Sequence, residues 1–156
     1  MWQKIKPYVI SILIPLAVGG LAAFLTRDSM DIYAEIVKPP LAPPGILFPI
    51  VWTLLYILMG VSAAMVYTAD APDPQKERAL SVYAISLVLN FTWSIIFFRF
   101  RVYLFAFVWL LALLFSILRT IRLYRPISAP AAYLQIPYAL WVAFAGYLNF
   151  AIYLLN

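Results

Sequence analysis

Two residue types are missing from this chain: its 156 residues include no cysteine and no histidine. Without cysteine there are no disulfide bonds and no thiolate nucleophile, and without histidine there is no imidazole general base. The usual ligands of zinc and of haem iron are absent as well. We therefore predict no metal site, and no pattern in the chain requires a cofactor.

Charge is also scarce, because only 11% of the residues are charged while 66% are hydrophobic. Soluble domains usually carry about 25% charged and about 45–50% apolar residues. A soluble domain of this length leaves much of its surface in water, so the composition predicts a protein that lies in a lipid bilayer. The net charge of +5 comes from scattered basic residues at the ends of apolar runs, and we expect no nucleic-acid partner.

Five apolar runs are long enough to cross a bilayer, since about 20 apolar residues span roughly 30 Å of hydrocarbon. The runs use nearly the whole chain and leave no room for a second domain. We predict an all-α membrane protein, a single domain over residues 1–156 that forms a five-transmembrane-helix bundle. The helices are expected at about residues 8–26, 46–68, 78–98, 102–123 and 129–154.

The first apolar run has an alternative interpretation as a signal peptide. It follows Lys4 and Lys6, and the small residues Ala22 and Ala23 lie near a candidate cleavage point. Its length and the four runs after it favour a helix that is retained. Pro15 is tolerable inside it, because in a membrane a neighbouring helix can satisfy the carbonyl group that a proline leaves free.

The connection over residues 27–45 is the one substantial polar segment. Residues 31–37 predict a short helix with Asp31 as its N-cap. The proline pairs at 39–40 and 43–44 then force extended backbone. We expect a stiff loop that enters the second helix at a fixed angle and acts as a lid over the pocket described below.

The basic residues give a prediction of orientation. Seven of them flank the side of the N-terminus and four flank the opposite side, which favours an N-terminus in the cytoplasm. The seven are Lys4, Lys6, Lys76, Arg78, Arg119, Arg122 and Arg125, and the four are Arg27, Lys38, Arg99 and Arg101.

Three aromatic residues of the second helix recur at every fourth position and therefore share one face: Phe48, Trp52 and Tyr56. An aromatic belt at the membrane interface is one explanation. Tyr56 lies deeper than such a belt, and its hydroxyl needs a partner. Contact with a ligand is the alternative explanation.

Polar and aromatic residues also lie deep in the third and fifth helices, where a belt does not explain them. Asn90 and Trp93 are neighbours on the third helix, and their role is either hydrogen bonding between helices or ligand contact. In the fifth helix, Trp141 follows a kink expected at Pro137, and Ala145 and Gly146 leave space beside the indole. A cavity wall and ordinary close packing both fit that pattern. Together the second, third and fifth helices predict an apolar pocket suited to a flat aromatic ligand.

These motifs, in this order, resemble the TspO/translocator protein family. Its members are the tryptophan-rich sensory proteins and the related peripheral benzodiazepine receptor, and this chain is similar to the bacterial type. The resemblance rests on residues 38–44, 48–56, 89–98 and 137–150, and it extends over essentially the whole chain.

The resemblance implies a five-helix homodimer that binds porphyrins such as protoporphyrin IX, and isoquinoline carboxamides, beneath the first loop. The implied role is porphyrin sensing, transport or disposal. A light-dependent breakdown of protoporphyrin, with Trp52 and Trp141 taking part, is an alternative. The pocket residues that the resemblance implies are Pro43, Pro44, Phe48, Trp52, Tyr56, Asn90, Trp93, Trp141, Ala145 and Leu148.

The chain departs from the family pattern in two informative places. Leu41 stands where many relatives have tryptophan, so the loop is expected to hold a porphyrin face less tightly. The cholesterol-recognition pattern needs a basic residue shortly after a tyrosine, and none follows Tyr153. We therefore expect no cholesterol site of that kind.

Small residues at a spacing of four offer candidate contacts for a homodimer, either Gly60 with Ala64 or Gly19 with Ala23. One further alternative for the function stays open on the sequence alone. The protein is then a structural membrane subunit without a ligand, and its aromatic residues serve packing only.

Overall fold

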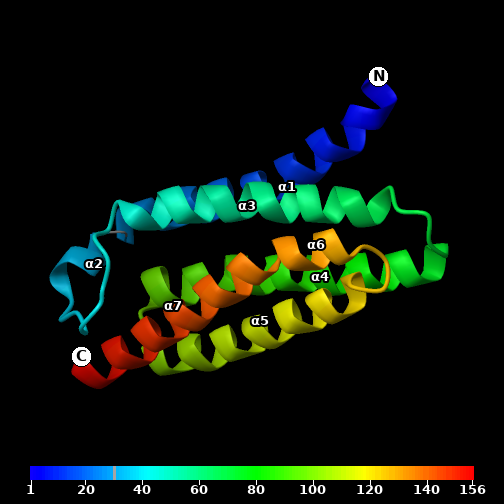
Figure 1. Ribbon diagram of the computed structural model, residues 1–156. Coiled ribbons are helices and arrows are strands. Elements are labelled where there is room, and N and C mark those ends of the chain that lie inside the picture. The colour runs from blue at the N-terminus through cyan, green and yellow to red at the C-terminus, as the bar shows by residue number, and fades with distance from the viewer. Residues whose placement is uncertain (30) are drawn as a thin grey trace.

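The computed structural model describes residues 1–29 and 31–156. In these residues, five helical spans are long and apolar enough to cross a membrane, which confirms the all-α, five-helix bundle (Figure 1). The long helices are α1 (Trp2–Thr26), α3 (Leu47–Tyr67), α4 (Asp73–Ser94) with the π-helical turn η2 (Ile95–Phe100), α5 (Tyr103–Tyr124), and α6 (Ala129–Leu134) followed by α7 (Ile136–Leu155). The first loop contains the 3₁₀ turn η1 (Arg27–Ser29) and the short helix α2 (Ile32–Glu35).

The helix ends differ from the prediction where polar residues extend a helix beyond its apolar run. Helix α1 begins at Trp2, about a turn and a half before the predicted start. Helix α4 begins at Asp73 because Pro74 fits its first turn, where a missing N–H costs nothing. Asp31 is the N-cap residue of α2, as predicted, but its side chain makes no capping hydrogen bond.

The kink predicted at Pro137 is present as an interruption between α6 and α7 at Gln135. Proline has no N–H to donate to the carbonyl four residues earlier, so the helix is weakest there. The buried Gln135 amide donates to the Ser62 hydroxyl of α3 (3.3 Å), and that hydroxyl donates to the Ala131 carbonyl (2.7 Å). These bonds fix the interruption against α3.

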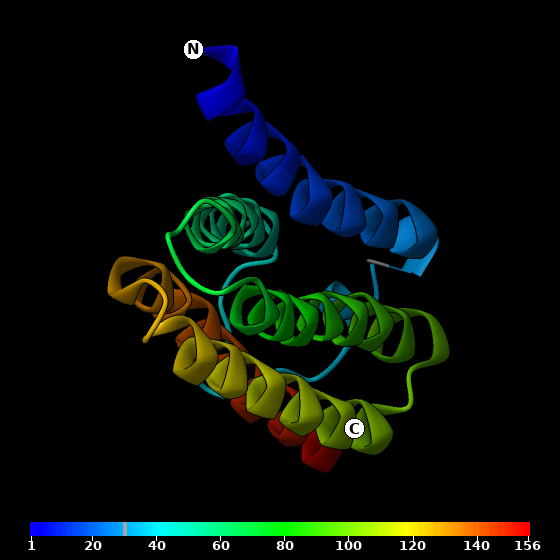
Figure 2. The ribbon, with the colours of Figure 1, turned by 90° about the vertical axis from the view of Figure 1, so that its right-hand side faces the viewer.

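The long helices share two ends of the bundle (Figure 1). The N-terminus and the α3–α4 and α5–α6 connections lie at one end, and α2 and the C-terminus lie at the other. Helices α4 and α5 form the predicted antiparallel hairpin, which turns at Arg101 in a left-handed conformation with φ of 59°. Figure 2 shows α1 on the outside of the bundle, crossing beside α3.

Helix α1 reaches α3 most closely at Gly60. A side chain at Gly60 would overlap the backbone of Ile12 and lie 2.7 Å from the carbonyl oxygen of Ser11. Ser11 precedes Pro15 by four residues, so its carbonyl is the one that Pro15 leaves without a helical donor. The freed oxygen faces the position that a Cβ at Gly60 would occupy, which in glycine is a Cα hydrogen, as in the weak Cα–H···O contacts between packed helices.

This contact corrects the proposed dimer positions. Gly60 and Ala64 are buried inside the single chain, so the prediction that they contact a second copy is wrong. At Gly19 the ring of Tyr56 fills the space where a side chain would be, but Gly19 is only half-buried and Ala23 is exposed, so that pair stays a prediction. The small residues do mark close helix approach, but the approach is between α1 and α3.

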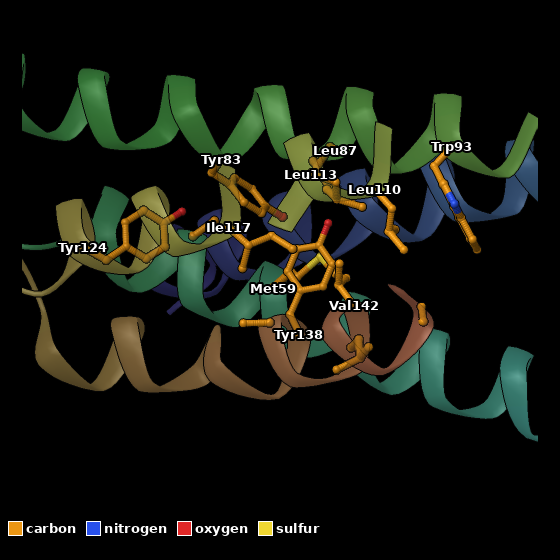
Figure 3. Close-up of a cluster of buried hydrophobic side chains, with 14 of the residues drawn as sticks. Met59, Tyr83, Leu87, Trp93, Leu110, Leu113, Ile117, Tyr124, Tyr138 and Val142 are labelled. Carbon is orange, nitrogen blue, oxygen red and sulfur yellow. The ribbon is translucent and has the colours of Figure 1, made fainter. Parts of the chain in front are cut away.

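The core lies among α3, α4, α5 and α7, away from the outer part of α1. Figure 3 shows side chains from these helices meeting there, with the tyrosine ring of Tyr138 in the middle. The phenol of Tyr138 accepts a hydrogen bond from the Asn90 amide (3.1 Å), which satisfies both groups in an apolar interior. Fully buried members of the core include Met59, Leu110, Leu113, Ile117, Tyr138 and Val142.

The α1–α3 contact gives a prediction with a matched control. Gly60→Ala is expected to lower the free energy of unfolding by about 1–3 kcal/mol, because the added methyl group collides with backbone rather than with a movable side chain. Gly20→Ala meets no atom within 4 Å and is expected to be neutral or slightly stabilising. Thermal unfolding in detergent micelles measures both, and equal melting temperatures for the two variants would contradict the contact.

Candidate functional site

A cavity of about 290 Å³ lies toward the end of the bundle that carries α2 and the C-terminus. Its wall comes from α1, α3, the end of α4 with η2, and α7, and Tyr33 of α2 also reaches it. The wall is mostly apolar, and no lining residue among those described carries a formal charge. Gly20, Ala23, Pro49 and Thr53 line it while remaining exposed, so the cavity opens at this rim.

The α3 side of the cavity is aromatic. Phe48, Trp52 and Tyr56 all line it, as their shared helix face predicts. The rings of Trp52 and Tyr56 stack at 5.6 Å with 28° between their planes. Tyr33 packs edge-on against Phe48 at 5.0 Å. The result is a broad aromatic surface with Tyr33 at its outer end.

The position of Tyr56 depends on Gly19 of α1. The Tyr56 ring occupies the volume in which any side chain at position 19 would begin. Glycine is therefore required here by close approach of a ring, not by an unusual backbone angle. The inner end of the aromatic wall is set by a residue without a side chain on the facing helix.

The side-chain amide of Asn149 links the α4 and α7 sides of the cavity by a hydrogen bond. The indole N–H of Trp93 donates to Oδ1 of Asn149 (3.0 Å), and Nδ2 of Asn149 donates to the Tyr103 carbonyl at the start of α5 (2.8 Å). Asn149 and Trp93 both line the cavity. The indole of Trp93 and the amide of Asn149 are thus paired, as an apolar environment favours.

The π-helical turn η2 brings two neighbouring rings to the cavity. Phe97 and Phe98 both line it, and their ring centroids are 4.9 Å apart. A regular helix separates consecutive side chains by 100°. The wider π-turn is a recurrent feature of functional sites, and here it accompanies a wall that uses two residues in succession.

Six of the ten residues implied for the pocket line this cavity, and four do not. Asn90 lies in the core, bonded to Tyr138 and close to the Tyr56 hydroxyl. The Pro43 carbonyl accepts the hydroxyl of Tyr33, and Pro44 is exposed. The six residues on the wall are Phe48, Trp52, Tyr56, Trp93, Ala145 and Leu148.

Trp141 is the fourth residue outside the cavity. Its ring packs against Phe48 at 5.9 Å and against Phe144 at 5.5 Å, so it contacts one residue of the cavity wall without lining the cavity. The indole nitrogen is buried and has no hydrogen-bond partner among the described residues. This position matches the packing interpretation of Trp141 more closely than the cavity-wall interpretation.

The sequence prediction left out the contribution of α1. One helix face supplies Leu16, Gly19, Gly20, Ala22, Ala23 and Thr26. The positions 16, 19, 20, 23 and 26 follow helical spacing, and four of the six residues are glycine or alanine. That run of small residues was the available signal, because it makes room for bulky aromatic side chains from α3.

Positive charge lies beside the rim rather than inside. The Lys38 ammonium is 5.1 Å from the centroid of the Tyr33 ring. Arg27 directly follows the lining residue Thr26, and its guanidinium lies 4.3 Å from the centroid of the Phe24 ring. Partial burial raises the pKa of Tyr33, and its hydroxyl donates to the Pro43 carbonyl. The cavity therefore has an uncharged lining, and the ammonium of Lys38 lies over one of its lining rings, that of Tyr33.

A second hollow of about 270 Å³ lies between α5 and α7. It is lined by apolar residues such as Leu111, Ala143 and Phe150, which are exposed and so face the lipid side of the bundle. Phe107 and Phe150 both line it with ring centroids 4.9 Å apart, but their planes are tilted by 41° and do not stack as those of Trp52 and Tyr56 do.

Comparison with known proteins agrees with this architecture, since the model of the TspO/MBR family matches residues 11–155. The chain belongs to the TspO/MBR family. It is 36% identical to the tryptophan-rich protein TspO of Chlorobaculum tepidum over 100% of this chain and 99% of that protein, and 39% identical to the one of Archaeoglobus fulgidus over 99% of each. It is also 36% identical to the translocator protein of Bos taurus, over 88% of this chain and 83% of that protein. The family and the five spans make this a multi-pass membrane protein.

The packing of Tyr56 against Gly19 is testable by a double-mutant cycle. Gly19→Ala is expected to cost about 1–3 kcal/mol in the wild type, because the methyl group and the ring claim the same volume. In a Tyr56→Ala background the same change is expected to cost almost nothing. Unfolding in detergent gives the coupling energy, and a value near zero would show that Tyr56 is not held by this contact.

Proposed function

We propose that this protein binds a flat tetrapyrrole, with free-base protoporphyrin IX as the best candidate, and acts in porphyrin sensing, transport or disposal. The observation that carries the proposal is the stacked pair Trp52 and Tyr56 on the wall of an apolar cavity. Aromatic faces stack on planar π-systems, and burial of a large ring removes much apolar surface from water.

The size of the cavity suggests how such a ligand lies. At about 290 Å³ it is near the lower end of the roughly 300–1,000 Å³ typical of small-molecule sites. A cavity of this volume suits a small planar amide such as an isoquinoline carboxamide. A tetrapyrrole is larger, so part of the ring projects through the exposed rim or side chains shift to admit it.

The charge distribution supports the same pose. Protoporphyrin carries two carboxylates on one edge, and no cation lines the cavity in the described residues. Lys38 and Arg27 beside the rim are the nearest candidates to pair with that edge. The apolar part of the ring then lies against Trp52. The acidic edge lies near water, where the carboxylates avoid the free-energy cost of desolvation.

The residue inventory favours the free base over haem. A haem iron is most often held by histidine or cysteine, and the chain has neither. Of the other protein ligands, no methionine lines the cavity in the described residues, and the hydroxyls of the lining residues Tyr33 and Tyr56 are engaged in hydrogen bonds. Binding must then rest on stacking and burial, which the free base offers equally well without needing an axial ligand.

The homodimer and the cytoplasmic N-terminus stay predictions. The two ends of the bundle each gather the connections that the charge count assigns to one side, which is consistent with five crossings. With Gly60 and Ala64 buried, any dimer must use other faces of the helices.

Titration of the purified protein with protoporphyrin IX, followed by tryptophan emission, tests the proposal. Saturable quenching at micromolar ligand is expected. Trp52→Leu removes a stacking interaction that contributes about 0.5–1.5 kcal/mol to binding. The substitution is expected to raise Kd about two- to tenfold. Trp2→Leu, at an exposed site on α1 outside the cavity, is the matched control. Unsaturable quenching, or equal loss in both variants, would reject binding in this cavity.

Light-dependent breakdown of bound protoporphyrin is a second candidate, favoured by the position of Trp52 on the wall. With dioxygen as the oxidant, an indole in contact with the excited ring is the residue placed to donate an electron. We expect slower porphyrin loss under illumination in Trp52→Phe and little change in Trp141→Phe, because Trp52 lines the cavity and Trp141 does not. Loss at the wild-type rate in both variants would assign the light reaction to the porphyrin alone.

A further inference from the structure

The cover loop, defined as residues 31–46, is held against the bundle by side chains of α7. Its own helix, α2, spans only four residues, and its two proline pairs supply no N–H groups. Little regular hydrogen bonding therefore holds the loop in place from within. Contacts with other parts of the chain must fix its position.

Asn156 makes the first of these contacts. Its Oδ1 accepts from the backbone N–H of Val37 (3.1 Å), and its Nδ2 donates to the carbonyl of the same residue (3.1 Å). The other amide hydrogen serves the Ile152 carbonyl at the end of α7 (2.9 Å). An asparagine amide offers two donors and an acceptor, and here all three are used. One side chain thus joins the loop to the last turn of α7.

Tyr147 makes the second contact, on the same helix. Its hydroxyl donates to the Pro40 carbonyl (2.6 Å), and its ring stacks on Phe144 at 6.2 Å. Pro40 is part of a turn in which the Ala42 N–H reaches the Pro39 carbonyl (3.3 Å). The hydroxyl of Tyr147 is therefore hydrogen-bonded to the turn at the tip of the loop.

The turn that Tyr147 grips is strained at the next residue. Leu41 has φ of 70°, a left-handed conformation that costs a non-glycine residue free energy, and its side chain is 82% exposed. No burial of the leucine offsets that cost. The hydrogen bond to the preceding carbonyl holds the peptide in the orientation that this backbone angle requires.

Neither Tyr147 nor Asn156 lines the cavity, but the segment they hold does reach it. Tyr33 of the cover loop packs on Phe48 and forms part of the wall. Helix α7 also supplies Ala145 and Leu148 to the same wall. The helix that forms one side of the cavity thus also fastens its cover.

We propose that Asn156 and Tyr147 form a latch that keeps the cover loop closed and sets the rate at which ligand enters and leaves the cavity. Both are positioning residues that act through the loop. Their hydrogen bonds are exposed, so water competes for them and each contributes modestly. A latch of this strength opens by local fluctuation without unfolding the bundle.

The first test needs no ligand. Hydrogen exchange of the cover loop is measured by mass spectrometry on the full chain in detergent or nanodiscs. Asn156→Ala and Tyr147→Phe are expected to speed exchange at Val37 and its neighbours by about three- to tenfold, as the loss of weak bonds allows. Asn156→Asp keeps the acceptor for Val37 and is expected to be intermediate. Tyr153→Phe is the matched control, because no hydrogen bond of its hydroxyl is found in the described residues.

The second test rests on the proposed function and follows release of bound protoporphyrin by recovery of tryptophan emission. Asn156→Ala and Tyr147→Phe are expected to raise the dissociation rate about three- to tenfold. Because the loop controls both entry and exit, the association rate should rise together with the dissociation rate, and Kd should change less than either rate. A residue that simply touched the ligand would change mainly the dissociation rate.

The outcomes separate the two proposals. Faster loop exchange in the variants of a protein that does not bind protoporphyrin keeps the latch and rejects the porphyrin. Normal binding, with loop exchange and release rates at wild-type values in both Asn156→Ala and Tyr147→Phe, overturns the latch. Because the two substitutions break different bonds, misfolding of one variant leaves the other to decide.

Discussion

One buried amide, that of Asn149, joins three helices beside the cavity. It accepts from Trp93 of α4 and donates to the backbone at Tyr103 of α5, while its own backbone belongs to α7. Polar groups in hydrocarbon are stable only when they find partners, and interhelical bonds in membranes average about 0.6 kcal/mol. The stabilisation is modest, but the geometry is specific. An amide fixes the rotation of α4 and α7 about their own axes, which apolar packing alone leaves free.

The remaining wall follows from two positions on neighbouring helices where a side chain is missing. Gly60 lets α1 approach α3, against the carbonyl that Pro15 freed, and Gly19 then receives the ring of Tyr56. Helix α1 can therefore form part of the cavity wall because Gly60 and Gly19 have no side chains. The small residues of α1 leave the space that the aromatic side chains of α3 occupy.

The sequence predicted the five spans and the shared face of Phe48, Trp52 and Tyr56, because hydropathy and helical spacing determine both. It could not predict how far α7 slides along α3. Trp141 and Ala145 do lie one turn apart on α7, yet the helices are offset so that Trp141 meets Phe48 and Tyr138 meets Trp52. Lipid and core are equally apolar, so spans of this composition carry little signal for such an offset. The latch contacts were also beyond prediction, since Asn156 and Val37 are 119 residues apart.

An experimental structure of the protein with protoporphyrin IX bound tests the central claim most directly. We expect the ring in the cavity between α1, α3, η2 and α7, with one face on Trp52 and Tyr56 and its carboxylates directed toward Lys38 and Arg27 outside the cavity. A porphyrin seated instead in the hollow between α5 and α7, away from Trp52, would contradict it.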